Sequence, residues 1–74
     1  MNSHLQLKNR IKKLRFEKGL TQTQLAEKCK TTQNTISSIE TGQYSPSAFL
    51  AGIICAALDC KFEDCFYYEM TEEK

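Results

Sequence analysis

Apolar residues recur at helical spacing along most of this chain of 74 residues. Leu7, Ile11 and Leu14 repeat at i, i+4 and i+7, which predicts an amphipathic helix ending at about Lys18, before Gly19. Later apolar positions predict four more short helices, whose inward-facing residues are Leu25, Ala26 and Cys29; Ile36 and Ile39; Leu50, Ile54 and Leu58; and Phe62, Cys65 and Phe66. The pattern therefore predicts an all-α fold of five short helices in one domain.

Short polar side chains mark the starts of three of these helices. Thr21 and Gln24 have the spacing of a capping box, in which each side chain bonds the other residue's backbone N–H. Thr32 begins the third helix, which runs to about Glu40, and Ser47, the last residue of the loop TGQYSPS, caps the fourth. Two helices joined by about three residues are typical of a helix-turn-helix, whose second helix enters the major groove of DNA.

The two ends of the chain carry a different pattern. HLQLK, residues 4–8, alternates apolar and polar positions, and CFYYE, residues 65–69, is rich in aromatic residues. The chain is polar after Tyr68, which predicts a tail that frays. The alternative is a brief strand at CFYYE that pairs with a short strand at HLQLK.

The composition favours a folded protein. Hydrophobic residues make up 41% of the chain, with one Pro and three Gly, which is enough apolar material for a small core. The longest nearly apolar run, AFLAGIICAAL (48–58), is too short to cross a bilayer. The opening MNSHLQLKNR lacks the apolar segment of a signal peptide. We therefore expect a cytoplasmic protein with no membrane partner.

Charge is distributed unevenly along the chain. The net charge is only +1, but residues 1–30 hold eight Lys or Arg against two acidic residues, whereas residues 31–74 hold two against seven. A chain divided in this way can present a basic face to a polyanion. The alternative is an ordinary solvated helix surface.

The four cysteines do not have the spacing of a common zinc site. Cys29, Cys55, Cys60 and Cys65 include no CxxC pair, and His4 is the only histidine. No secretory signal supplies the oxidising compartment in which disulfides persist. We therefore expect no metal and no cofactor, and interpret the cysteines as small buried hydrophobic residues.

The order of short motifs resembles one known family. The run NRIKKLRFEKGLTQTQLAEKCKTTQNTISSIETGQYSPS, continued through AALDCKFEDCF, is similar to the Xre/Cro-CI class of bacterial and phage repressors. LTQ, LAEK, TIS, IE, G and PS occur in the family's order and spacing. The resemblance implies a lambda-repressor-like helix-turn-helix domain over residues 9–66, an N-terminal arm or short strand at 1–8, and a C-terminal strand or tail at 67–74.

The resemblance also implies a sequence-specific regulator of transcription, encoded by a bacterium or a phage. Its partner would be double-stranded DNA. One recognition helix covers only a few base pairs, so a homodimer on a near-palindromic operator is expected. The main hypothesis is therefore a dimeric repressor.

Amide and hydroxyl side chains at the start of the third helix suit base readout. Adenine presents an acceptor and a donor in the major groove, which a Gln or Asn amide can meet with two hydrogen bonds, and Ser or Thr can pair with several bases. In related repressors, the residue at the place of Gln33 reads a base. We expect base contacts from Gln33, Asn34, Thr35 and Ser38; the alternative is ordinary exposed surface.

Phosphate contacts would position such a protein on the duplex without reading its sequence. Gln22 opens the second helix, where free backbone N–H groups favour an anion, and the family uses the matching Gln for the DNA backbone. The full set of expected phosphate contacts is Gln22, Lys30, Thr32, Thr41, Gln43 and Tyr44.

The resemblance further implies a largely buried ion pair between Arg15 and Glu40; the alternative is two unrelated surface charges.

The chain departs from the family pattern at several positions. At the positions of Lys30 and Asp59 the family usually has Gly, because the residue there takes a positive φ. A second apolar stripe on the fourth helix, at i, i+4 and i+7, would be exposed in a monomer. With aromatic residues near the C-terminus it predicts a dimer or partner surface: Phe49, Ile53, Ala56, Phe62, Phe66 and Tyr67. The alternative for the stripe is contact with the chain's own ends.

Two other functions stay open alongside the dimeric repressor. One is an antitoxin, whose apolar stripe binds a toxin while its DNA binding regulates its own gene. The other is a thiol-responsive or metal-responsive regulator that uses the cysteines. An enzyme is not expected, because the chain has no catalytic His–Cys–Asp set, phosphate loop or paired carboxylates in a predicted cleft.

Overall fold

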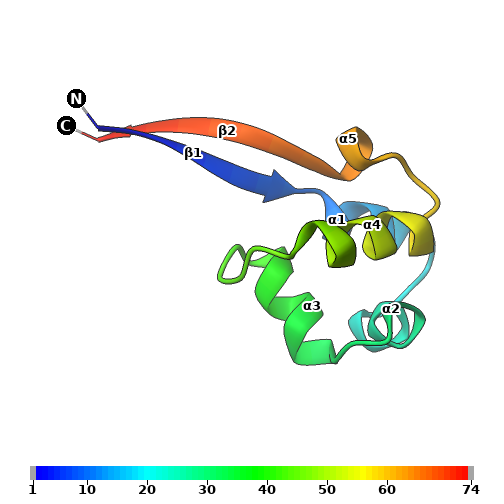
Figure 1. The fold of residues 1–74 in the computed structure, drawn as a ribbon. Coiled ribbons are helices and arrows are strands. Elements are labelled where there is room, and N and C mark those ends of the chain that lie inside the picture. Colours follow the sequence, from blue (N-terminus) through cyan, green and yellow to red (C-terminus); the bar gives the residue numbers. More distant parts are fainter. Residues whose placement is uncertain (1, 74) are drawn as a thin grey trace.

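Two strands and five helices follow one another along residues 2–73, the part of the chain that this computed structural model describes, with side chains described for residues 5–70. The elements are β1 (Asn2–Asn9), α1 (Ile11–Glu17), α2 (Gln22–Cys29), α3 (Gln33–Glu40), α4 (Ala48–Ala57), α5 (Phe62–Cys65) and β2 (Phe66–Glu73). The helices form one body, and the two strands form a ribbon that extends from it (Figure 1). The predicted five-helix fold with a β-pair is confirmed.

The predicted helix caps are present. Thr21 accepts a hydrogen bond from the Gln24 backbone N–H at 3.0 Å, and the Gln24 side chain accepts one from the Thr21 N–H at 2.9 Å. Thr32 and Ser47 cap α3 and α4 in the same way. These caps satisfy N–H groups that a helix start leaves unpaired, so local sequence sets where the three helices begin.

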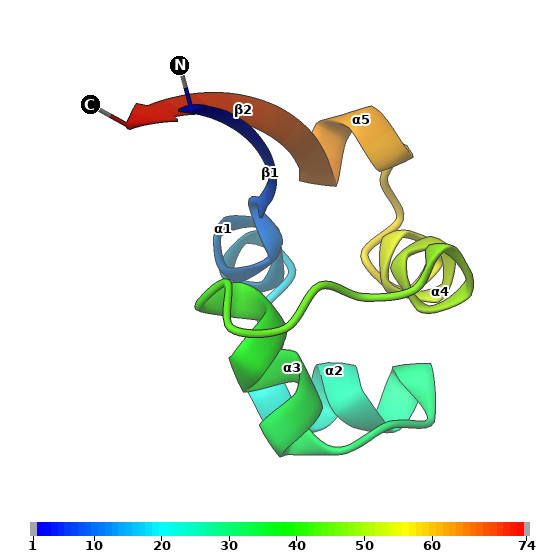
Figure 2. The same ribbon diagram turned by 60° about the vertical axis from the view of Figure 1, so that its left-hand side comes forward.

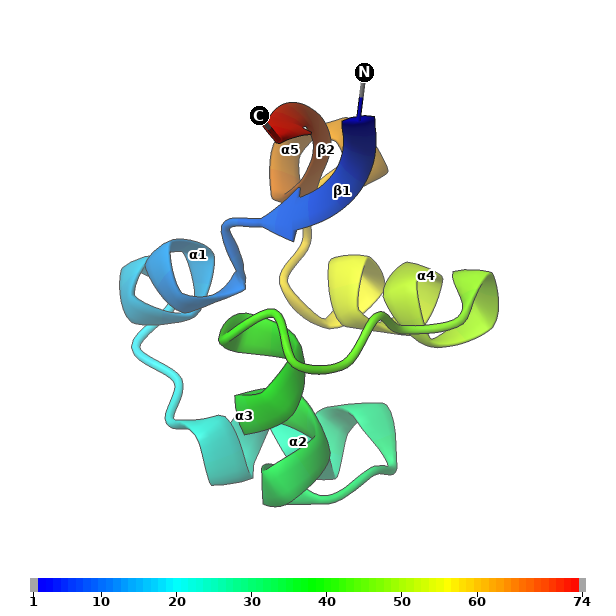
Figure 3. The ribbon, with the colours of Figure 1, turned by 90° about the vertical axis from the view of Figure 1, so that its left-hand side faces the viewer.

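The core lies where the helices meet, as seen along the sheet in Figure 3. Its largest fully buried side chains come from every helix: Ile11, Leu25, Ile36, Ile39, Ile54, Leu58 and Cys65. These are the positions that the helical periodicity indicated. None of the helices within residues 2–73 combines the length and apolar character that a membrane span requires.

The ribbon joins the two ends of the chain. β1 and β2 are antiparallel, with Asn2 opposite Glu73 and Asn9 opposite Phe66, so both termini lie at the tip farthest from the helices (Figure 1). Two predictions were wrong here. The first helix begins at Ile11, so Leu7 lies in a strand, and the segment after Tyr68 continues as a strand instead of fraying. Pairing between the ends satisfies backbone groups that each segment alone would leave to water.

Candidate nucleic-acid interface

α2 and α3 form a helix-turn-helix at the opposite end of the molecule from the ribbon (Figure 2). Lys30 takes φ 59° in the turn between them, which is the left-handed conformation expected from the family pattern. Ile36 and Ile39 of α3 are buried against the other helices. Gln33 and Asn34, in the first turn of α3, are exposed on the outside. The helix therefore presents its polar first turn to the surroundings.

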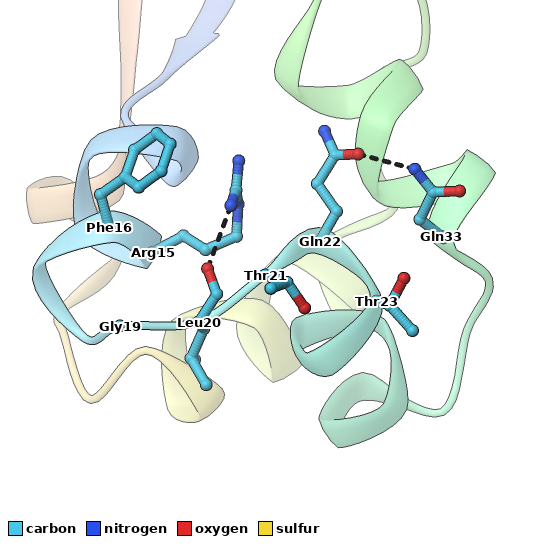
Figure 4. Close-up of a pocket in the computed structure, with 8 residues that line it drawn as sticks. All are labelled: Arg15, Phe16, Gly19, Leu20, Thr21, Gln22, Thr23 and Gln33. Atoms are coloured by element: carbon cyan, nitrogen blue, oxygen red, sulfur yellow. Dashed lines mark hydrogen bonds between the residues drawn. The ribbon is translucent and has the colours of Figure 1, made fainter.

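A chain of hydrogen bonds connects Gln33 to the interior. The Gln33 amide nitrogen donates to the Gln22 side-chain oxygen at 2.7 Å, drawn as a dashed line in Figure 4. The Gln22 amide nitrogen donates in turn to the Glu40 carboxylate at 3.1 Å. Because a carboxylate only accepts hydrogen bonds, the Gln22 amide must turn its nitrogen toward Glu40 and its oxygen toward Gln33. The Gln22 oxygen can then hold only the nitrogen end of the Gln33 amide. The Gln33 carbonyl oxygen faces away from Gln22 (Figure 4).

Arg15 and Glu40 form a nearly buried ion pair beneath this chain. The Arg15 Nε donates to one carboxylate oxygen of Glu40 at 2.8 Å, and Nη2 donates to the other at 3.2 Å. The third guanidinium nitrogen donates to the Leu20 carbonyl at 3.0 Å. The two charged side chains are only 7% and 5% exposed. The pair ties α1 to the end of α3, and bidentate geometry of this kind is among the stronger charge-assisted contacts.

A shallow groove of about 290 Å³ lies beside α3. It is lined by Asn34, Thr35, Ser38 and Tyr44, three of which are expected base contacts. Thr35 is partly engaged within the helix start, since its hydroxyl lies 2.9 Å from that of Thr32. Tyr44 is 50% exposed, at the edge of the groove. The groove therefore joins the expected base contacts to one expected phosphate contact.

The loop after α3 is held to the helix by its backbone. The N–H groups of Gln43 and Tyr44 both donate to the Ser38 carbonyl, at 2.9 and 3.2 Å. Gly42 between helix and loop takes φ 84°, where an L side chain would be strained. Thr41 donates its hydroxyl to carbonyls of the last helical turn, so this side chain is partly used as a helix cap. Three of the expected phosphate contacts, Thr41, Gln43 and Tyr44, are thus held next to the C-terminal end of α3.

Not every basic residue of the first 30 is available to a polyanion. Arg15 is buried in its ion pair, and Arg10 lies over the Tyr67 ring with 4.1 Å between its guanidinium carbon and the ring centroid. Lys8 lies 3.7 Å from Glu69, and Lys18 lies 3.8 Å from Asp59. Four of the eight basic residues in the N-terminal part are therefore engaged in contacts within the protein.

The predicted dimer or partner surface needs one clear correction. Phe66 is only 2% exposed and stacks on Phe62 with 5.1 Å between ring centroids, so it is a core residue. It is the first residue of β2, and the sheet turns its side chain toward the helices. On α4, Phe49 is 80% exposed and Ala56 is also exposed, whereas Ile53 is half-buried against the core.

Three of the four cysteines meet in the fold, which the sequence analysis did not predict. Cys55, Cys60 and Cys65 place their sulfur atoms within 4.8 Å of one another, whereas Cys29 lies apart in α2. Burial raises the pKa of the Cys55 thiol to about 11 and that of the Cys65 thiol to about 12, and the charge interaction with Cys60 raises both further. Only the spacing of five residues between successive cysteines could have suggested this cluster.

The pair α2 and α3, which exposes the polar first turn of α3 and buries the apolar side of each helix, is typical of a helix-turn-helix DNA-binding protein. A family model described as helix-turn-helix matches residues 11–65, and the chain belongs to this Xre/Cro-CI-like family of transcriptional regulators. The members are DNA-binding regulators and not enzymes, which confirms the expectation from the sequence.

Relatives and solved structures agree with this membership. The chain is 43% identical over 63 residues to the HTH-type transcriptional regulator YgzD of Bacillus subtilis, covering 85% of this chain and 96% of that protein. It is 42% identical over 66 residues to a Methanocaldococcus jannaschii HTH-type transcriptional regulator, covering 89% and 100%. The structure of ClgR, the clp gene regulator of C. glutamicum, matches with a TM-score of 0.69 and 30% identity, over 73% of this chain and 70% of that one. A Bacteroides fragilis protein matches with a TM-score of 0.75 and 28% identity, over 82% and 98%.

Proposed function

We propose that this regulator is a dimeric repressor that reads a near-palindromic operator with α3. The hydrogen-bonded chain from Gln33 through Gln22 to Glu40 and Arg15 carries the proposal. An exposed amide loses side-chain entropy when DNA fixes it, and a partner that already orients it reduces that cost. Gln33 is thus prepared to meet adenine with its carbonyl oxygen and its remaining N–H.

Residues around Gln33 take the supporting roles in this proposal. Asn34, Thr35 and Ser38 read further bases from the groove along α3. Gln22, at the start of α2, contacts a phosphate and also holds Gln33 in place. The remaining phosphate contacts are Lys30, Thr32, Thr41, Gln43 and Tyr44. A protein bound in this way represses transcription by occupying DNA that RNA polymerase needs.

Replacing Gln33 with Ala is expected to weaken binding to the specific operator by about 1–3 kcal/mol per half-site, because a bidentate base contact is lost. Binding to unrelated DNA should change little, since phosphate contacts supply it. Fluorescence anisotropy with operator and scrambled duplexes at one fixed salt concentration measures both. The operator itself is found by footprinting on DNA upstream of the gene.

Gln6→Ala is the matched control for this measurement. Gln6 is an exposed glutamine on β1, far from the helix-turn-helix, so its loss should leave both affinities unchanged. Gln22→Ala should weaken binding to every sequence and also reduce discrimination. If Gln33→Ala lowered affinity equally for operator and scrambled DNA, base readout by this residue would be wrong.

The proposed dimer interface lies on one face of the ribbon and the neighbouring helices. Leu5, Tyr68 and Met70 are 62%, 63% and 65% exposed, and Leu5 pairs with Met70 across the sheet. Leu5 and Tyr68 border a groove of about 420 Å³ between the ribbon and α4, which is also lined by Phe62, 45% exposed. A two-stranded ribbon is marginally stable by itself, so a second copy packed on this apolar face would stabilise it.

Two neighbouring substitutions on β1 test this interface. Leu5→Lys puts a charge on the apolar face, whereas Gln6→Lys adds the same charge on the opposite face of the same strand. Sedimentation velocity should show the wild type and Gln6→Lys as dimers at micromolar concentration and Leu5→Lys as a monomer. The two half-sites of the operator should then lie about 34 Å apart, one turn of DNA.

A monomeric wild type that binds one half-site as well as a palindrome would contradict the dimer. The exposed apolar residues, with Phe49 the most exposed of them, would then favour a regulator that acts with a protein partner, such as an antitoxin with its toxin. The same variants distinguish a homodimer from a complex with a protein partner. In a homodimer, Leu5→Lys changes the mass of the free protein in solution, whereas in a partner complex it weakens only partner binding and leaves that mass unchanged.

A further inference from the structure

Three thiols form a compact cluster at the junction of the helices with β2. The sulfur atoms of Cys55, Cys60 and Cys65 lie within 4.8 Å of one another. Cys65 is fully buried, Cys55 is 5% exposed and Cys60 is half-buried against the core. Among the side chains described, the cluster has these three potential ligands.

The backbone brings the three residues together. Asp59, two residues beyond the end of α4, takes φ 54°, and the Cys60 N–H donates to the Cys55 carbonyl at 3.0 Å, the bond pattern of a Schellman motif. This motif folds the residue after the turn back over the last helical turn, which sets Cys60 beside Cys55. Cys65 ends α5, where its carbonyl accepts the Arg10 N–H at 2.7 Å. The positions of all three thiols are therefore set by hydrogen-bonded backbone.

We propose that these thiols form a binding site for trivalent arsenic, taken up as arsenite. Bonds from sulfur to a soft ion are about 2.3 Å long, and because the lone pair makes the three bonds pyramidal, the three sulfurs around arsenic lie about 3.5 Å apart. The sulfur atoms of the cluster, which lie within 4.8 Å of one another, have to move closer to reach that spacing. Trivalent arsenic takes three sulfur ligands and keeps a lone pair in place of a fourth.

The charge of the product favours arsenic in this buried place. Three thiolates around Zn²⁺ would leave a net negative charge, and around Cu⁺ a larger one, whereas three around trivalent arsenic are neutral. Burying net charge is costly. In the reaction, As(OH)₃ meets three thiols: three As–O bonds break and three As–S bonds form. Each hydroxyl leaves with one thiol proton as water, and arsenic stays trivalent.

A tetrahedral zinc site would need a fourth ligand. Asp64, which precedes Cys65, uses its carboxylate to accept the Lys61 N–H at 3.2 Å. Asp59, which precedes Cys60, is paired with Lys18 at 3.8 Å. Among the described residues, no carboxylate oxygen lies within 4.8 Å of all three sulfur atoms, so the three-coordinate ion is the better match.

The test is titration of the whole protein with arsenite, in a phosphine reductant because a dithiol would compete. Native mass spectrometry should show one arsenic gained and three hydrogens lost, and X-ray absorption should show three sulfurs around the arsenic. Arsenite should also raise the melting temperature, because it binds the folded state. Cys60→Ala should weaken binding by about 100-fold or more, since one intramolecular ligand is lost.

Cys29→Ala is the matched control, because Cys29 is 3% exposed and lies outside the cluster. It should bind arsenite as the wild type does. Should Cys55→Ala or Cys65→Ala not fold, Cys60→Ala and the sulfur count still decide the outcome. Two sulfurs around arsenic, unchanged binding in Cys60→Ala, or tighter binding of Zn²⁺ than of arsenite would each overturn the proposal.

Discussion

Replacing Arg15 with Ala should lower the free energy of unfolding by about 3–5 kcal/mol, because it leaves the Glu40 carboxylate buried without its counter-charge. Glu40 is 5% exposed and receives two hydrogen bonds from Arg15, so water cannot replace the guanidinium easily. For a domain of this size the melting temperature should fall by more than roughly 10 °C. Thermal unfolding followed by circular dichroism measures the change.

Lys18→Ala is the control for this ion pair. Lys18 and Asp59 are 45% and 92% exposed, and exposed pairs contribute about 0–1 kcal/mol. The melting temperature of this variant should therefore stay close to that of the wild type. Equal, small effects of Arg15→Ala and Lys18→Ala would mean that the Arg15 pair is as well solvated as a surface pair.

Replacing Phe66 with Ala should cost a further large amount of stability, about 3–5 kcal/mol, because it empties a buried aromatic site. Phe66 is 2% exposed, stacks on Phe62 and begins β2, so its loss loosens the attachment of the ribbon to the helices. Denaturant unfolding at several protein concentrations measures the loss. If Phe66 is a core residue, the loss of free energy of unfolding in Phe66→Ala is the same at every protein concentration. If Phe66 only contacts a second copy in a dimer, that loss depends on protein concentration.

Phe49→Ala gives the comparison for the same side chain outside the core. Phe49 is 80% exposed, so its removal should change the stability of the monomer by no more than about 0.5 kcal/mol. If Phe66→Ala were no more destabilising than Phe49→Ala, the assignment of Phe66 to the core would be wrong.

Local signals in the sequence predicted the helical part of the fold. The caps at Thr21, Thr32 and Ser47 depend on residues three positions apart, and the spacing of apolar residues shows which side of each helix is buried. The positive φ at Lys30 and Asp59 likewise follows from how a helix ends. The family resemblance added the expected roles of Gln33 and Gln22, which binding measurements have to test.

Only the tertiary structure decided features that depend on residues far apart in the chain. Leu7 satisfies both a helical and an alternating pattern, and pairing with Tyr68 across the ribbon makes it a strand residue. The same strand pairing directs the side chain of Phe66 toward the core. The link from Gln33 to Gln22 and Glu40, and the meeting of three cysteines, likewise arise from chain reversals between elements. Periodicity and capping report on neighbours within about one helical turn, so they carry no information on which distant side chains the fold brings into contact.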